Sequence, residues 1–221
     1  MDPVYIIIGA IIVIAFIAAF FIYENKRTSQ FADIAKIMGF EFQAKGQDAL
    51  LNKLNPFHLF SQGHSKKMKN LIFGEANGIQ IAIFGYKYTV GAGKNSHTTR
   101  QTVVYFSSPR LDLPAFVLRP ENVFHRIGKV FGYADIDFAS HPEFSKYYLL
   151  RGNDEEAIRS IFNDEMITYI EKQKKVSIEG QQNQLILYHK RKRIKPELIQ
   201  SIIDEGLAVY KLFAVSKGVK P

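Results

Sequence analysis

The stretch that decides the fold is Leu71–Val90, with the sequence LIFGEANGIQIAIFGYKYTV. Two apolar runs, Leu71–Ala76 and Ile79–Val90, flank the dipeptide Asn77-Gly78. Because both residues of this dipeptide tolerate a positive φ, the pattern predicts a β-hairpin closed by a type I′ turn. In the second run, isoleucines alternate onto one face of the predicted strand and aromatic residues occupy the other.

Downstream of this hairpin, strand patterns and helix patterns alternate along the chain. Strands are predicted at His97–Ser107, Leu113–Arg119 and Lys146–Arg151, and in a second hairpin that joins Val176–Ile178 to Leu185–Tyr188. Helices are predicted at Asp48–Leu54, from Pro120 to about Phe131, from the capping residue Asp154 to Ile170, and from Pro196 to Phe213. Antiparallel strands separated by helices predict an α+β domain, in which the strands pack with the helices.

Upstream of the hairpin, residues Val4–Tyr23 are apolar or aromatic and contain no charge. A helix of this length is about 30 Å long, which matches the hydrocarbon core of a bilayer. Tyr5 and Tyr23 lie near its ends, where the membrane interface favours amphipathic rings. A cleaved signal peptide is the alternative, but no Lys or Arg precedes the run, and the run is long for one. We therefore expect one N-terminal transmembrane helix at 4–23.

Basic residues near the ends of this helix predict its orientation. Lys26 and Arg27 follow the apolar run at once, whereas the other side carries only the α-amino group next to Asp2. Because Lys and Arg favour the cytoplasmic side, the N-terminus is expected outside and the rest of the chain in the cytosol.

The expected organisation after the anchor has three parts. Residues 24–65 are predicted as juxtamembrane helices and a loop, 66–213 as the α+β domain, and 214–221 as a tail. Apolar residues at helical spacing over Phe31–Met38, followed by Gly39, predict a helix that either continues the anchor or packs on the domain. Phe57, Leu59 and Phe60 are predicted to form a compact apolar group in a loop.

The soluble part is basic. The chain has 221 residues and a net charge of +8, and the part from Glu24 onward carries +9, from 29 basic minus 20 acidic residues. Beside a cytoplasmic leaflet, each Lys or Arg near anionic lipid gains about 1 kcal/mol. Nucleic acid would attract the same charge. The chain has no cysteine, which excludes disulfides, thiolate zinc sites and a cysteine nucleophile.

Clusters of basic residues are the candidate lipid-binding sites. The candidates are Lys190, Arg191, Lys192, Arg193 and Lys195, between the second hairpin and the last helix, and Lys66, Lys67 and Lys69 before the first hairpin. These clusters are typical of an anionic-lipid patch near a membrane, or of a solvated turn. A third group, Lys87, Lys94, His97 and Arg100 with Tyr86 and Tyr88, is expected near one hairpin tip, where it could bind headgroups or single-stranded nucleic acid.

One acidic cluster permits a different chemistry. Asp135, Asp137, His141 and Glu143 lie close together in sequence, with His125 upstream. Carboxylate and imidazole groups at such spacing could hold a divalent metal that activates water. The alternative is a loop held by hydrogen bonds from side chains to the backbone.

The middle of the chain resembles a family of single-span bacterial membrane proteins of unknown function. The residues that carry the resemblance are Phe84-Gly85-Tyr86-Lys87-Tyr88-Thr89, Gly91-Ala92-Gly93-Lys94, Gln101-Thr102-Val103, Leu113-Pro114-Ala115-Phe116-Val117-Leu118-Arg119-Pro120-Glu121, Asp135-Ile136-Asp137-Phe138 and His141-Pro142-Glu143-Phe144-Ser145. The likeness covers roughly Gly74 to Tyr210. It implies one bacterial domain behind one anchor and contributes no ligand or catalytic residue.

These features together favour a membrane-anchored cytosolic interaction or assembly module at the bacterial inner membrane. We expect it to be non-enzymatic, to need no cofactor, and to contact other membrane proteins, a second copy of itself or anionic lipid. The alternatives are a metal-dependent hydrolase that uses Asp135, Asp137 and His141, and a nucleic-acid-binding domain.

Overall fold

The computed structural model describes residues 3–121, 135–173 and 175–215. The helix expected from Pro120 to about Phe131 and the candidate ligand His125 fall on residues 122–134, outside this described part.

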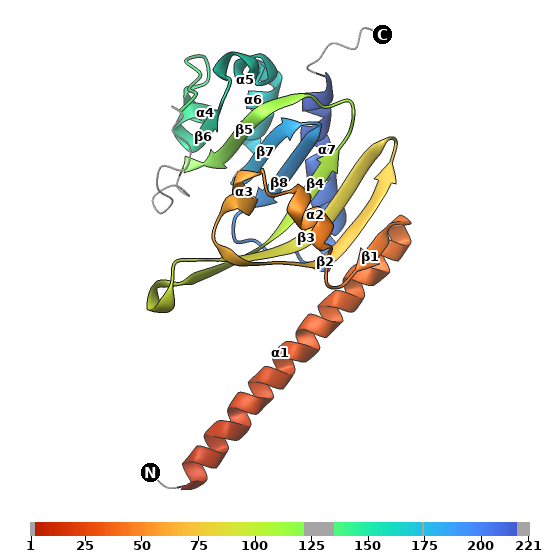
Figure 1. Cartoon of the computed structure of the whole chain (residues 1–221), viewed down its shortest axis with the longest axis vertical. Coiled ribbons are helices and arrows are strands. Elements are labelled where there is room, and N and C mark those ends of the chain that lie inside the picture. The colour runs from red at the N-terminus through yellow and green to blue at the C-terminus, as the bar shows by residue number, and fades with distance from the viewer. Residues whose placement is uncertain (1–2, 122–134, 174, 216–221) are drawn as a thin grey trace.

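An antiparallel sheet is the centre of the fold (Figure 1). Within the described residues it has eight strands in the order β1-β2-β3-β4-β8-β7-β5-β6. The strands are β1 (Glu41–Gln43), β2 (His64–Ala76), β3 (Ile79–Val90), β4 (His97–Ser107), β5 (Leu113–Pro120), β6 (Tyr148–Gly152), β7 (Val176–Gln182) and β8 (Gln184–His189). With the helices described next, this sheet confirms the predicted α+β class.

The first hairpin forms at the predicted turn. Ala76 pairs with Ile79, and the two intervening residues have positive φ, 54° at Asn77 and 73° at Gly78. These are the dihedrals that a type I′ turn requires. Local turn chemistry therefore fixes the register from which β2 and β3 extend.

Helices lie on both faces of the sheet. They are α1 (Pro3–Met38), α2 (Asp48–Lys53), α3 (His58–Ser61), α4 (Pro142–Tyr147), α5 (Glu155–Ile161), α6 (Asp164–Lys172) and α7 (Ile199–Val215), with short 3-10 turns at Gly93–Asn95 and Pro196–Leu198. One face packs with α5, α6, α7 and the end of α1, and the other face packs with α3 and the residues around α2.

Two sequence predictions were wrong in detail. The single helix predicted after Asp154 is divided, because Asn163 accepts a hydrogen bond from Met166 N (2.9 Å) and so caps α6 as a separate helix. The strand predicted from Lys146 begins only at Tyr148, because Pro142 starts the helix α4, which runs to Tyr147.

The segment 24–65 belongs to the same packed fold. β1 pairs with β2, and the apolar residues Phe57, Leu59 and Phe60 are buried against the sheet, with the last two in the helix α3 and not in a loop. The sequence periodicity could not show this packing, because α3 is only one turn long.

Helix α1 has an exposed apolar stretch long enough to cross a membrane and a last part that packs on the domain. It is continuous over 36 residues and is thus about 54 Å long. Its most apolar 18-residue window has a mean hydropathy of 3.0, and none of that window is buried. Its last turns pack on the sheet, where Phe31 and Ala35 are buried. Among the described helices, α1 alone is long and apolar enough to cross a membrane.

Candidate functional site: a basic cavity between the anchor and the sheet

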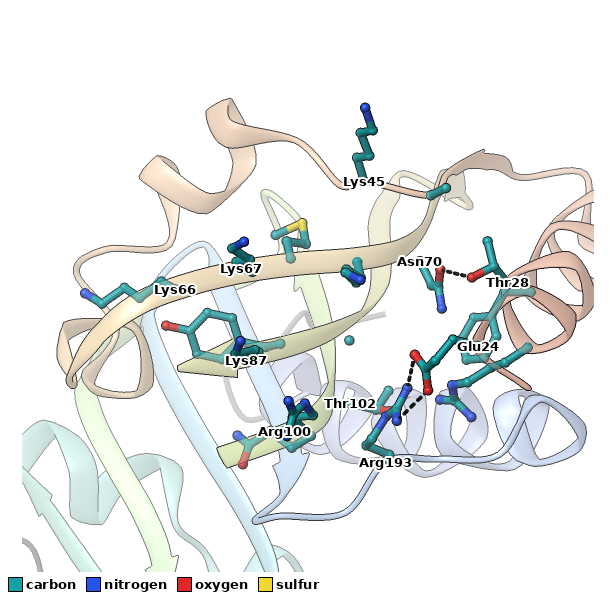
Figure 2. Close-up of a pocket in the computed structure, with 18 of the residues that line it drawn as sticks. Glu24, Thr28, Lys45, Lys66, Lys67, Asn70, Lys87, Arg100, Thr102 and Arg193 are labelled. Carbon is teal, nitrogen blue, oxygen red and sulfur yellow. Dashed lines mark hydrogen bonds and ion pairs between the residues drawn. The ribbon is translucent and has the colours of Figure 1, made fainter. Parts of the chain in front are cut away.

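A cavity of about 950 Å³ lies where α1 meets the sheet (Figure 2). Its walls come from α1, α2 and the loop before it, strands β2, β3 and β4, and the segment after β8. Its basic lining residues are Arg27, Lys45, Lys66, Lys67, Lys69, Lys87, Arg100 and Arg193. Among the described residues, these eight basic side chains face only two acidic ones, Glu24 and Asp48, in the lining. We call this space the junction cavity, and its charge suits an anionic ligand.

Strand register aligns three of these cations. Lys67 on β2 lies opposite Lys87 on β3, and Lys87 lies opposite Arg100 on β4. Directly opposed residues share one face of a sheet, and neighbouring strands are about 4.8 Å apart. We call these three residues the cation row, and Figure 2 shows them one after another across the three strands.

The anchor forms the opposite end of the junction cavity. Both carboxylate oxygens of Glu24 accept hydrogen bonds from Arg193, each 2.9 Å long. The Arg193 hydrogen bond lowers the pKa of Glu24, although partial burial opposes the shift. Next to this pair, Thr28 Oγ1 donates to Asn70 Oδ1 at 3.0 Å (Figure 2). The anchor is therefore joined to the domain by polar contacts around the cavity.

Arg27, on α1, is a buried cation in the lining of the junction cavity. Its side chain is 5% exposed, it donates through Nη2 to the carbonyl of Ile194 at 2.6 Å, and its guanidinium lies 4.7 Å from the centre of the Phe31 ring. Burial lowers the pKa of Arg27, and the charge of Arg193 lowers it further. An arginine remains charged in this setting, so the wall keeps its positive potential.

Three buried polar groups of the lining have no hydrogen-bond partner within the part of the chain that the structure describes. They are Arg27 Nε, the Tyr86 hydroxyl and Gln101 Nε2. The Gln101 oxygen is already used, because it accepts from Arg191 N at 3.2 Å. Burial raises the pKa of Tyr86, so its hydroxyl stays protonated and able to donate. Strand alternation places the side chains of Tyr86 and Gln101 on the sheet face opposite Lys87 and Arg100, where Tyr86 packs against Phe60. Of the three groups, only Arg27 therefore lies on the cavity side.

The predicted lipid-binding residues divide between this cavity and other places. Lys66, Lys67, Lys69 and Arg193 line the junction cavity, and Lys190, Arg191, Lys192 and Lys195 are not among its lining residues. Lys66 Nζ already donates to the Phe60 carbonyl at 2.5 Å.

The five-residue basic cluster is split by a turn. Arg191 adopts a positive φ of 61°, directly after the end of β8. Lys195 then pairs with Glu197 at 3.8 Å, and burial lowers the pKa of Lys190 to about 8. The turn at Arg191 divides the run, and of its five residues only Arg193 lines the junction cavity.

Sequence reasoning did not assign Arg27 or Lys45 to a binding site. It expected Lys87 and Arg100 near a hairpin tip with Lys94 and His97, and the structure places only the first two in the junction cavity. The register set by the Asn77-Gly78 turn could not have found the cation row, because it would place Lys67 opposite Tyr88. A β-bulge between Lys69 and Ile72, where Asn70 has a positive φ of 50°, shifts Lys67 to lie opposite Lys87.

The candidate metal ligands are engaged with other parts of the fold. Asp135 Oδ1 accepts from Leu150 N at 3.0 Å, and burial raises the pKa of Asp135. His141 lies 3.1 Å from Asp164, and Glu143 lies 3.9 Å from Lys146. The Asp137 carbonyl accepts from Arg159 Nη1 at 2.8 Å. Across residues 3–121, 135–173 and 175–215, no three His, Cys, Asp or Glu side chains gather as a metal-binding group.

A second polar cluster joins α3 to the sheet. Glu179 is 1% exposed and accepts from Leu59 N (3.1 and 3.2 Å) and from the Tyr188 hydroxyl (2.8 Å). Burial raises its pKa to about 7. Nearby, Arg119 donates to His58 Nε2 at 2.8 Å, and burial together with the Arg119 charge lowers the His58 pKa to about 4. His58 is therefore neutral, and the cluster holds α3 in place.

No protein-family model matches the chain, and no curated protein has a matching sequence. A solved structure, that of the mycobacterial trehalose monomycolate transport factor A, TtfA, is similar in fold, with a TM-score of 0.60. The two chains are 16% identical, and the match covers 88% of this chain and 96% of that one. At this identity the likeness shows a shared α+β fold.

Proposed function

We propose that this chain is a membrane-anchored, non-enzymatic interaction module, whose α+β domain lies in the cytosol at a bacterial inner membrane and contacts anionic lipid headgroups. The observation that carries the proposal is the junction cavity. Residues as far apart as Arg27 and Arg193 bring their charges together at the point where α1 leaves its apolar stretch. Charges that served only to keep the domain soluble would be spread over its surface.

The position of the cavity along α1 supports the proposal. Phe20 and Phe21, which belong to the apolar run, line the junction cavity together with Glu24 and Arg27. If the apolar run lies in the bilayer, the cavity then lies at the level of the headgroups. There each Lys or Arg gains about 1 kcal/mol from an anionic leaflet.

The shared fold gives support for an accessory role. The neighbour of similar fold is described as a transport factor for trehalose monomycolate. By analogy, we propose that this chain assists other membrane proteins or a second copy of itself, and that headgroup contact fixes how its domain is presented to them.

Lipid selectivity of the full-length chain in bilayers tests the proposal. Electron paramagnetic resonance of spin-labelled phosphatidylglycerol and phosphatidylcholine measures how strongly each lipid associates with the reconstituted protein. We expect wild type to prefer phosphatidylglycerol. The triple variant Lys67→Gln, Lys87→Gln, Arg100→Gln should lose most of this preference, since it removes about 1 kcal/mol for each charge near the surface.

A matched control neutralises three exposed lysines outside the junction cavity. Lys146→Gln, Lys172→Gln and Lys211→Gln remove the same formal charge. The control should keep the preference for phosphatidylglycerol. Equal association of both lipids with wild type, or equal losses in the two triple variants, would contradict the proposal.

A further inference from the structure

We infer that the junction cavity binds one anionic phospholipid per chain, with its phosphate at the cation row and its acyl chains in the bilayer beside Phe20 and Phe21. The inference rests on the proposed function and goes further, because it replaces a diffuse attraction to many headgroups with one bound molecule.

The cation row is the first argument. Favourable cross-strand pairs each stabilise a sheet by about 0.2–1 kcal/mol, whereas like charges directly opposite each other on neighbouring strands destabilise it. Within the described residues no ion pair to a carboxylate is found for Lys67, Lys87 or Arg100. A phosphate between these side chains would accept charge-assisted hydrogen bonds and remove the repulsion.

The rest of the lining contains few carboxylates to balance its cations. Of its two acidic residues, Glu24 is already held by Arg193, and Asp48 is exposed. Arg27 Nε, in the wall formed by α1, is buried and has no partner among the described residues. A buried donor without a partner carries a desolvation penalty of about 1–3 kcal/mol. A ligand rich in acceptor oxygens would remove this penalty.

The apolar end of the cavity distinguishes a lipid from free phosphate. Phe20 and Phe21 are 56% and 60% exposed, lie on the membrane side of Glu24, and pack edge to face with ring centres 6.1 Å apart. A free phosphate would use only the cationic end. A volume of about 950 Å³ is also far more than one phosphate needs, and it lies at the upper end of the range for ligand sites.

The floor of the cavity has an open position at Gly85. Gly85 lies between Lys69 and Thr102 across the sheet, on the same face as the cation row. The absence of a side chain there leaves the middle of this face open. The polar walls and the open floor together match a headgroup that enters from the membrane side.

Native mass spectrometry of the full-length chain in detergent tests the inference. The probes are dioleoyl phosphatidylglycerol, dioleoyl phosphatidylcholine and water-soluble glycerol phosphate. We expect one phosphatidylglycerol per chain to be retained, and the cation-row triple variant to weaken it about ten-fold or more. The control triple variant at Lys146, Lys172 and Lys211 should retain it like wild type.

A second variant separates lipid from phosphate. Phe20→Ala with Phe21→Ala should weaken phosphatidylglycerol and leave any glycerol phosphate binding unchanged, because it alters only the apolar end. Equal occupancy by glycerol phosphate and phosphatidylglycerol would overturn the lipid assignment. Circular dichroism of each variant checks that the fold is kept.

The outcomes also separate this inference from the proposed function. If mass spectra showed several weakly bound lipids per chain, with the same distribution in wild type and in the cation-row variant, the single site would be overturned. If bilayers still showed phosphatidylglycerol preference in that case, the proposed headgroup contact would stand without it.

Discussion

Glu24 on the anchor helix accepts two hydrogen bonds from Arg193, which lies 169 positions later in the chain, and both are 2.9 Å long. This pair joins α1 directly to the segment between β8 and α7. Helix α1 is therefore not joined to the domain by a flexible linker. It continues into the domain as one helix, and this ion pair and buried apolar contacts fix it there.

Breaking this pair should loosen the joint in a pH-dependent way. Arg193→Gln should lower the free energy of unfolding in detergent by about 1 kcal/mol at neutral pH, as expected for a bidentate but partly exposed pair. The pKa of Glu24 is lowered on folding from an unfolded value of 4.5. The contribution is therefore full above pH 4.5 and is lost as the pH falls through the lowered pKa. Denaturation at pH 7 and pH 3 measures it, and an equal difference at both pH values would contradict the account.

The docking of α1 predicts a larger effect at Phe31. This side chain is 1% exposed, so Phe31→Ala should lower the free energy of unfolding by about 3–5 kcal/mol. Ile37 on the same helix is 85% exposed, and Ile37→Ala should change stability by less than about 0.5 kcal/mol. Chemical denaturation of both variants tests the prediction, and equal losses would show that α1 does not pack on the sheet as described.

The buried carboxyl of Glu179 predicts a second pH dependence, of opposite sign. Its pKa rises from 4.5 in the unfolded chain to about 7 in the folded one. The folded state then binds the proton more tightly, so this group's contribution is most favourable below pH 4.5 and is lost as the pH rises through 7.

Glu179→Gln should remove that dependence. Relative to wild type, the variant should gain about 3 kcal/mol between pH 4.5 and pH 8, from about 1.4 kcal/mol per pKa unit. His58 titrates in both proteins and contributes little to the difference. Unfolding free energies measured across this range check the slope, and parallel curves would contradict it.

Close packing of α7 on β4 predicts the outcome of a glycine substitution. Helix interiors usually favour Ala over Gly by about 1 kcal/mol. A Cβ at Gly206, however, would lie 2.7 Å from the buried Phe106 ring. Gly206→Ala should therefore destabilise the domain, whereas Gly9→Ala, with nothing within 4 Å, should not. Thermal melts of both variants decide it, and a stabilised Gly206→Ala would mean that α7 lies further from the sheet.

The proposed orientation predicts the behaviour of reporter fusions. Lys26 and Arg27 lie within four residues of the end of the apolar run, so a fusion at the C-terminus should lie in the cytosol. Green fluorescent protein fused there should fluoresce and alkaline phosphatase should be inactive. Active alkaline phosphatase would reverse the proposed topology.

The sequence could predict features that depend on neighbouring residues. The turn at Asn77-Gly78 and the apolar run of α1 both follow from local chemistry, and both appear as expected. The break at Asn163 was missed because Ile161 and Met166, on its two sides, are buried in the same core and keep an apparently continuous stripe.

The junction cavity depends on contacts that no local pattern contains. Its cation row requires the register of β2, β3 and β4, which brings Lys67 and Arg100 onto one face. Its anchor wall requires α1 to dock beside Arg193. A cluster of charges in sequence is therefore a poor guide to this site, because the turn at Arg191 separates the densest basic run.

Photo-crosslinking from the cavity floor tests the central claim most directly. Gly85 tolerates a side chain, since its Cβ would approach only the Lys69 carbonyl, at an ordinary 3.4 Å. A photoreactive amino acid placed there, in the full-length chain in bilayers of phosphatidylglycerol and phosphatidylcholine, should crosslink to phosphatidylglycerol well above its share of the bilayer. Crosslinks to the two lipids in proportion to their abundance, or to no lipid, would contradict the account.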